Sequence, residues 1–226
     1  MTSLARRATA EFVGTGLLVT IVVGSGIAAS RLSPHDAGLR LAENAAATAA
    51  GLAVIILMVG PTSGAHLNPV VSLVDWALGR RDTTALGVYA LAQTSGAIGG
   101  AMLANLMFGL PAVTIAETVR TGPPLWLAEV VATTGLVALV FSLSRTGRAH
   151  LAAPAVGAYI GSAYWFTSST SFANPAVTVG RVFSDTFAGI APESVAPFVV
   201  AQVVGAVAGA ALVLVLHPAP ALKESV

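Results

Sequence analysis

Charged residues are scarce in this chain of 226 residues, and cysteine is missing altogether. Asp, Glu, Lys and Arg make up 9% of the sequence, whereas a soluble domain carries about 25%. So few charges cannot cover a soluble fold of this size with a polar surface. The net charge of +1 is too small to attract a polyanion, so we expect no nucleic acid partner.

The absence of cysteine excludes disulfides, thiolate metal sites and cysteine nucleophiles. The four histidines show no spacing that would hold a metal ion. No Gly-x-Ser-x-Gly nucleophile elbow, phosphate loop or dinucleotide fingerprint occurs either. We therefore expect no enzymatic activity, no cofactor and no metal site.

Hydrophobic residues are abundant at 55%, and they gather in long runs. A membrane-spanning helix needs about 20 largely apolar residues. Because the runs do not alternate, helices are expected rather than the strands of a barrel. The sequence therefore predicts a multi-pass, all-α membrane protein with one integral domain over 1–226. The six predicted spans are 8–29, 41–60, 85–108, 125–143, 151–168 and 195–217.

The Lys and Arg residues in the short connections predict the orientation. With a cytoplasmic N-terminus, seven of the 11 lie inside and four lie outside. This bias predicts that both termini are cytoplasmic. The inside set is Arg6, Arg7, Arg80, Arg81, Arg145, Arg148 and Lys223, and the outside set is Arg31, Arg40, Arg120 and Arg181.

The sequence repeats itself in two halves, at approximately 1–110 and 120–226. Ala-Glu-Phe-Val-Gly-Thr at 10–15 resembles Ala-Glu-Val-Val-Ala-Thr at 128–133. The pattern Ala-Gln-x-x-Gly-Ala-x-x-Gly occurs at 92–100 and again at 201–209. Three spans in each half mean that the second copy enters the membrane from the opposite side. This inverted repeat predicts a functional site at the midplane, between the halves.

Each half also contains an Asn-Pro motif in a segment too short and too polar to span a bilayer. The motifs are Asn68, Pro69 and Val70 in the first half and Asn174, Pro175 and Ala176 in the second. Asn caps a helix, and Pro suits its first position, so each motif predicts a re-entrant half-helix. The two half-helix N-termini would meet and make the midplane positive. Such a site repels cations and passes uncharged molecules that form hydrogen bonds.

These motifs resemble the aquaporin/glycerol-facilitator family, also called the major intrinsic proteins. The resemblance rests on Ser-Gly-Ala-His-Leu-Asn-Pro-Val at 63–70, the Asn-Pro-Ala at 174–176 and the repeated glycines. It implies an inverted repeat of six transmembrane helices and two re-entrant half-helices. It also implies one pore per protomer, a homotetramer in the lipid bilayer, and passive conduction of water or small neutral solutes. In this family, residues matching Glu11 and Glu129 support the re-entrant loops, and His66 is a packed loop residue.

The resemblance places the selectivity filter at Thr48, Ser162, Ser171 and Val177. A gap of one residue would replace Ser162 by Gly161, or Ser171 by Phe172. Val177 stands where family members generally carry Arg, so a permanent charge and five donors are missing. Because the other assigned residues are small, we expect a wide filter with little charge.

With this wide filter, the sequence resembles the bacterial aquaglyceroporin subgroup associated with arsenic resistance. That resemblance implies a channel in the inner membrane for neutral metalloid hydroxides, such as As(OH)3, or methylated arsenicals. Glycerol and water are expected as further permeants.

Three features carry alternative interpretations. Inverted repeats and broken helices also occur in secondary carriers, where Glu11 and Glu129 would relay protons. A sealed structural protein of the same fold is a third hypothesis. Arg181 follows Val177 by one helical turn and is either a displaced vestibule charge or an interfacial partner of Asp185. We favour the channel, the supporting glutamates and the pairing with Asp185.

Overall fold

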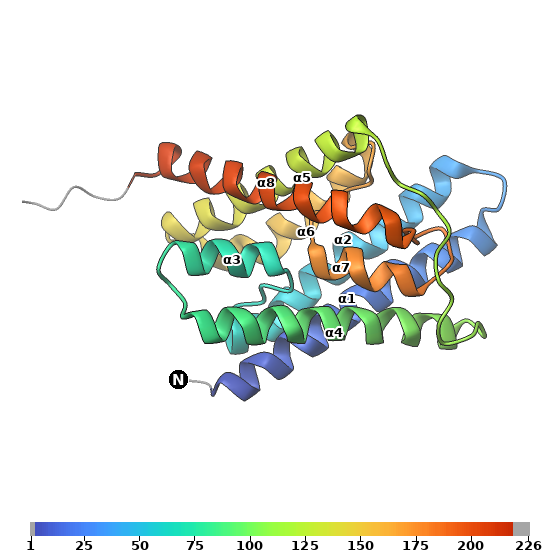
Figure 1. Ribbon diagram of the computed structural model, residues 1–226, viewed down its shortest axis with the longest axis horizontal. Helices are drawn as coiled ribbons and strands as arrows, with labels where there is room; N and C mark the ends of the chain where they lie inside the picture. The colour runs from blue at the N-terminus through green and yellow to red at the C-terminus, as the bar shows by residue number, and fades with distance from the viewer. Residues whose placement is uncertain (1–2, 219–226) are drawn as a thin grey trace, which may run out of the picture.

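A computed structural model describes residues 3–218, so Lys223 lies outside the described part of the chain. That part is entirely helical, and its helices form one elongated bundle (Figure 1). The fold class expected from the sequence is therefore confirmed. The six long helices are α1 (Leu4–Leu32), α2 (Ala37–Ser63), α4 (Thr83–Met107), α5 (Pro123–Arg145), α6 (Ala152–Phe166) and α8 (Pro192–Leu216). The short elements are α3 (Pro69–Ala77), α7 (Pro175–Gly180) and the 3-10 turns η1 (Ala149–Leu151) and η2 (Arg181–Phe183).

The long helices agree with the six predicted spans to within a few residues at each end. Four of them, α1, α2, α5 and α8, are long and apolar enough to cross a membrane. Helix α4 is outside that set, and α6 has only 15 residues, but both run beside the others in the bundle (Figure 1). Following the predicted orientation, we call the end that carries the 108–122 connection the outer end, and the opposite end the inner end.

Small residues allow the helices to pack closely. A Cβ atom on Gly100 of α4 would lie 2.1 Å from the carbonyl oxygen of Gly16 on α1. In the second half, a Cβ atom on Gly209 of α8 would lie 2.7 Å from the carbonyl oxygen of Thr134 on α5. The hydroxyl of Thr20 also donates a hydrogen bond to the Gly100 carbonyl at 3.0 Å. The glycine stripes of both halves are therefore helix-packing faces, at which only glycine permits this approach.

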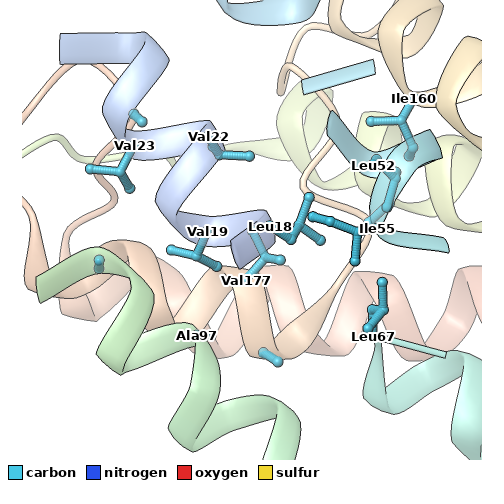
Figure 2. Packing of buried hydrophobic residues seen from close by; sticks show 14 of the residues in the cluster. Leu18, Val19, Val22, Val23, Leu52, Ile55, Leu67, Ala97, Ile160 and Val177 are labelled. Atoms are coloured by element: carbon cyan, nitrogen blue, oxygen red, sulfur yellow. The ribbon is translucent and has the colours of Figure 1, made fainter. Parts of the chain in front are cut away.

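An aliphatic cluster connects the two halves around the centre of the bundle (Figure 2). Helix α1 contributes five buried residues from one face, between positions 18 and 27. Residues of α2, α6 and the two re-entrant segments pack against them. Several of the same side chains also border the central cavity, so the core and the channel wall are one surface. The labelled members are Leu18, Val19, Val22, Val23, Leu52, Ile55, Leu67, Ala97, Ile160 and Val177.

Candidate functional site

Both short helices begin at the asparagine of an Asn-Pro motif. The Asn68 side-chain oxygen accepts a hydrogen bond from the backbone N–H of Val70 at 3.1 Å, and Pro69 takes the first helical position. Asn174 likewise accepts hydrogen bonds from the N–H groups of Ala176 and Val177 at 3.0 and 3.3 Å, and Pro175 takes the first helical position. Each asparagine therefore caps its half-helix and turns its amide toward the other half.

The two half-helices are joined where they meet. The Asn68 amide nitrogen donates to the carbonyl of Ala173 at 2.8 Å, and the Asn174 amide nitrogen donates to the carbonyl of Leu67 at 2.7 Å. Each amide has two N–H groups, so one remains for a solute in the cavity that both asparagines border. The junction thus offers two fixed donors at the positive ends of two helix dipoles.

The loops that lead into the half-helices adopt left-handed backbone conformations. Ala65 and Leu67 have φ values of 49° and 53°, and Ser171 and Ala173 have 53° and 47°. Side chains other than glycine rarely adopt this region, which costs on the order of 1–2 kcal/mol per residue. Two matched pairs of such residues need surrounding interactions that hold them.

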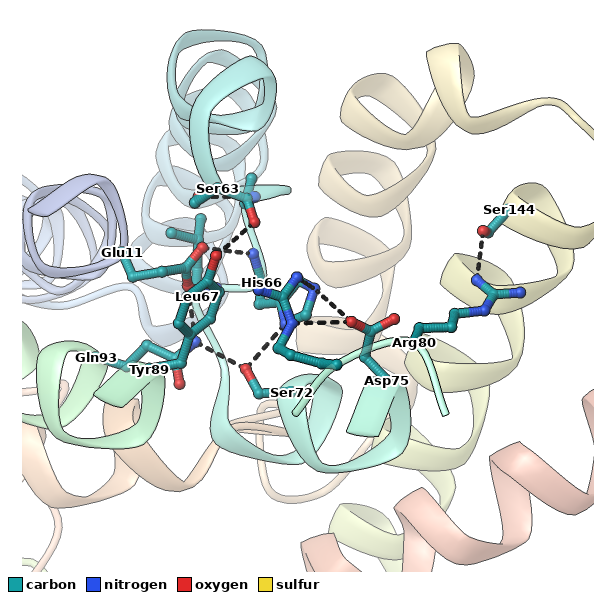
Figure 3. A network of polar contacts seen from close by, with 12 residues as sticks. Glu11, Ser63, His66, Leu67, Ser72, Asp75, Arg80, Tyr89, Gln93 and Ser144 are labelled. Atoms are coloured by element: carbon teal, nitrogen blue, oxygen red, sulfur yellow. Dashed lines mark hydrogen bonds and ion pairs between the residues drawn. The ribbon is translucent and has the colours of Figure 1, made fainter. Parts of the chain in front are cut away.

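Glu11 holds the first loop. Its carboxylate is fully buried and accepts backbone hydrogen bonds from His66 at 3.0 Å and Leu67 at 2.6 Å (Figure 3). The side-chain amide of Gln93 donates to the same carboxylate at 2.7 Å and to the hydroxyl of Ser72 at 3.1 Å. A carboxylate thus ties α1 to the loop and, through Gln93, to α3 and α4.

Glu129 holds the second loop in the same way. Its buried carboxylate accepts backbone hydrogen bonds from Phe172 at 2.9 Å and Ala173 at 2.8 Å, and one from the Ser169 hydroxyl at 2.6 Å. Gln202 donates to Glu129 at 2.7 Å and to the Thr178 hydroxyl at 2.9 Å. All hydrogen-bond donors to the two carboxylates come from the re-entrant loops and the neighbouring helices. The two glutamates therefore hold the loops in place.

Sequence reasoning missed the polar role of Gln93 and Gln202, which it used only as part of the repeated Ala-Gln-x-x-Gly pattern. A usable signal was present, because each glutamine occupies the same repeat position in its half, as each glutamate does. A buried amide needs a partner, and the matching buried carboxylate is the available one.

A cavity of about 550 Å³ passes between the two halves. Arg80, Ser144 and His150 border it near the inner end, and Asn68 and Asn174 border it near the middle. The remaining wall is mostly aliphatic, with Leu18, Val22, Leu52, Val140, Val156 and Ile160. The cavity therefore has a polar strip of amides and loop backbone facing an apolar strip of helix side chains.

Three of the four predicted filter residues come together on this cavity. Thr48, Ser171 and Val177 border it and are 2%, 4% and 5% exposed. Phe172, the alternative to Ser171, also borders the cavity. Both candidates from the loop therefore belong to the wall.

Ser162 is not brought to the cavity. Its side chain is exposed on α6 and donates to the carbonyl of Tyr159 at 2.8 Å. The pore face of α6 carries Ile160, and Ser162 lies two residues farther, about 200° around the helix axis. From α6, Tyr164 contacts Thr48 instead, with its hydroxyl 3.3 Å from the Thr48 hydroxyl.

The interpretation of Arg181 as the partner of Asp185 is wrong. The Arg181 side chain is 3% exposed, and its Nε donates to the carbonyl of Ala188. Asp185 instead accepts a hydrogen bond from the backbone N–H of Glu117 at 3.1 Å. The α-helical spacing behind the prediction fails because α7 ends at Gly180 and continues as a 3-10 turn.

Arg120 lies beside Arg181, which the sequence did not predict. Its Nε donates to the carbonyl of Gly189 at 2.9 Å, and one Nη donates to the carbonyl of Phe187 at 3.2 Å. Burial lowers the pKa of Arg120, a shift that the charges of Tyr164 and Glu129 oppose. A guanidinium still remains protonated at neutral pH.

The polar network of Glu11 and Gln93 continues around His66 toward the inner end (Figure 3). The His66 ring contacts the Ser72 hydroxyl at 2.9 Å and lies 5.4 Å from the Tyr89 ring, edge to face. Asp75 accepts from Nε of Arg81 at 3.0 Å and lies 3.6 Å from His66 Nε2. His66 is thus a packed loop residue that also borders the cavity. Within residues 3–218, no group of three or more His, Asp or Glu gathers to hold a metal ion.

Comparison with known proteins agrees with this arrangement. The family described as Major intrinsic protein matches residues 1–172. The aquaglyceroporin AqpS of Rhizobium meliloti (strain 1021) is 50% identical over 225 residues, with 98% of this chain and 95% of the relative covered. The propanediol uptake facilitator PduF of Citrobacter freundii is 29% identical, with 93% and 91% covered. In fold, the chain is similar to the X-ray structure of the aquaglyceroporin from Plasmodium falciparum, at a TM-score of 0.71, 20% identity and 96% coverage of both chains.

Proposed function

The chain belongs to the major intrinsic protein family and forms a passive membrane channel for small solutes, and we propose that its filter admits neutral solutes larger than water. The permeants that we infer are neutral metalloid hydroxides, such as As(OH)3, and methylated arsenicals. Glycerol and water are further permeants. The similarity to an aquaglyceroporin and to a propanediol uptake facilitator supports a channel for hydroxylated solutes.

One observation carries the proposal. Val177 borders the cavity, three residues after Asn174, at the position where the family resemblance expects an arginine. A valine side chain is shorter than arginine and brings neither charge nor donors into the pore. Thr48 and Ser171, which border the same part of the cavity, are also small. A filter of this composition leaves room for a solute with several hydroxyl groups.

The remainder of the wall suits the same solutes. Asn68 and Asn174 each hold one amide N–H ready to donate to a hydroxyl oxygen. The aliphatic strip formed by Leu18, Val22 and Ile160 faces the carbon or arsenic side of the solute. Such a wall replaces hydration of a neutral polyol or hydroxide but not hydration of an ion.

Solute flux into proteoliposomes tests the proposal. Stopped-flow light scattering would compare water, glycerol, As(OH)3 and methylated arsenicals in one preparation, with empty liposomes as the control. We expect entry of glycerol and As(OH)3 that does not saturate and does not depend on ion gradients. Saturable accumulation driven by an ion gradient would instead support the carrier, and absence of flux would support the sealed protein.

We also infer a homotetramer in the inner membrane of a bacterial cell, with both termini cytoplasmic. Because the native chain has no cysteine, single cysteines report the orientation cleanly. An impermeant maleimide added to intact cells should label H35C, in the α1–α2 connection, but not T146C, at the end of α5. The reverse pattern would overturn the orientation, and a mass of one chain in detergent would overturn the tetramer.

A further inference from the structure

We propose that Arg181 and Arg120 provide the positive charge of the filter from behind Phe172, and so determine that cations are excluded. This inference rests on the proposed function. It assigns the exclusion of protons and small organic cations to two residues outside the wall. The channel would thereby keep an electrostatic barrier while Val177 keeps the passage wide.

Phe172 connects the two arginines to the cavity. Phe172 is one of the residues that border the cavity, whereas neither Arg181 nor Arg120 borders it. The guanidinium carbon of Arg181 lies 3.5 Å from the Phe172 ring centroid, and that of Arg120 lies 5.3 Å from it. Both distances are within the range of a cation–π contact. The two cations therefore lie against the ring of a residue that borders the passage.

The ring is fixed in this position from two sides. Phe198 packs edge to face against Phe172, with 5.2 Å between ring centroids and 79° between ring planes. The Phe172 backbone N–H donates to Glu129 at 2.9 Å. The face of an aromatic ring is negative and its edge is positive, so a guanidinium stacked on the face is attracted to the ring. The ring thus holds the two cations next to the cavity wall without neutralising their charge.

The charges of the two arginines are not compensated by an ion pair. In the described part of the chain, the ion pairs are those of Asp75 with Arg81 and His66, at the inner end. The guanidinium groups of Arg181 and Arg120 donate hydrogen bonds to carbonyl groups of residues 187–189. A buried cation without a carboxylate partner is costly to desolvate. The Glu129 carboxylate, which accepts a hydrogen bond from the Phe172 N–H at 2.9 Å, is the acidic group that acts on both arginines. Two cations against one carboxylate leave a net positive charge beside Phe172.

The position of these cations also explains how a wide filter could stay selective. An arginine at position 177 would place its side chain in the passage. Arg181, one turn farther along the chain, contributes its charge but no volume to the wall. Charge acts over several ångströms in a poorly hydrated site, whereas steric exclusion requires contact. Neutral hydroxides and polyols would pass, while ammonium-type cations and protons would be repelled.

Proteoliposomes containing R181Q test the inference. The measurement is the flux of methylammonium and of protons, each divided by the flux of glycerol in the same vesicles. We expect the cation-to-glycerol ratio to rise on the order of tenfold, the effect of one unit charge near a poorly hydrated pore. R181K should keep the parent's ratio, since it keeps the charge.

Arg31 offers a matched control. It lies at the outer end, stacks on Phe108 with 5.2 Å between the guanidinium carbon and the ring centroid, and donates to the Phe108 carbonyl at 2.8 Å. Neither residue borders the cavity. R31Q should therefore leave the flux ratio unchanged. An equal rise in R31Q and R181Q would overturn the proposal.

R120Q provides a second variant in case R181Q does not fold. It leaves Arg181 in place, so we expect a smaller rise in the same ratio. Parent-like ratios in every glutamine variant that folds, R181Q or R120Q, would overturn the inference alone, provided that the parent passes glycerol. If the parent passes no neutral solute, the proposed function fails, whatever the arginine variants do.

Discussion

Replacing Glu129 by glutamine tests whether the buried carboxylates hold the re-entrant loops. The carboxylate accepts four hydrogen bonds, from Ser169, Phe172, Ala173 and Gln202. A glutamine keeps the shape but replaces one acceptor oxygen by an NH2 group. In either orientation, that NH2 group faces a backbone N–H. Both groups are donors, so no hydrogen bond forms between them and the backbone N–H is left unpaired.

The structure gives the size of the effect. Hydrogen bonds to a charged group contribute about 1.5–3 kcal/mol each, and a buried donor without a partner costs about 1–3 kcal/mol. E129Q removes the charge from the acceptor of four hydrogen bonds and leaves one donor unpaired. We therefore expect the free energy of unfolding to fall by about 3 kcal/mol or more. At about 2–4 °C per kcal/mol for a chain of this size, Tm falls by about 6–12 °C.

Thermal unfolding in detergent is the assay, with glycerol flux as a second measurement. E11Q should show a smaller loss, because Glu11 accepts three hydrogen bonds rather than four. E117Q, at an exposed position, is the control and should unfold like the parent. If E129Q matched E117Q in Tm and flux, the loops would not depend on the carboxylate and the reasoning would be refuted.

Two further predictions compare neighbouring positions. G100A should lower the free energy of unfolding by about 1–3 kcal/mol through overpacking, and so lower Tm, because its Cβ would meet the Gly16 carbonyl oxygen at 2.1 Å. G99A, with nothing within 4 Å of its Cβ, should not lower Tm, and equal Tm values for both variants would contradict the packing account. S171W should block glycerol flux, because Ser171 borders the cavity, whereas S162W should conduct like the parent. Block by S162W would return Ser162 to the filter.

Local patterns in the sequence were sufficient for most of the fold. Six long apolar runs and the two Asn-Pro motifs determine helices through hydropathy and capping, which depend on near neighbours. The pairing of the halves also follows, because matched motifs such as Glu11 and Glu129 occur in the same order. These features need no knowledge of which helix faces which.

Contacts across the bundle were harder to predict. Ser162 was assigned by counting from Asn174, but the loop between them does not preserve a helical register, and α6 turns another face to the pore. Arg181 was assigned to Asp185 by α-helical spacing, which ends at Gly180. Its contact with Phe172 and its proximity to Arg120 depend on how the loop after α7 folds back, and no local pattern records that.

The most direct test of the wide filter is solute flux through V177R in proteoliposomes, with V177L as the control for added volume alone. The measurement is the ratio of As(OH)3 flux and of glycerol flux to water flux. We expect V177R to lower both ratios at least tenfold, because arginine adds both length and charge to the wall beside Thr48 and Ser171. V177L should lower them less. A V177R channel that passes As(OH)3 and glycerol as fast as the parent would contradict the account.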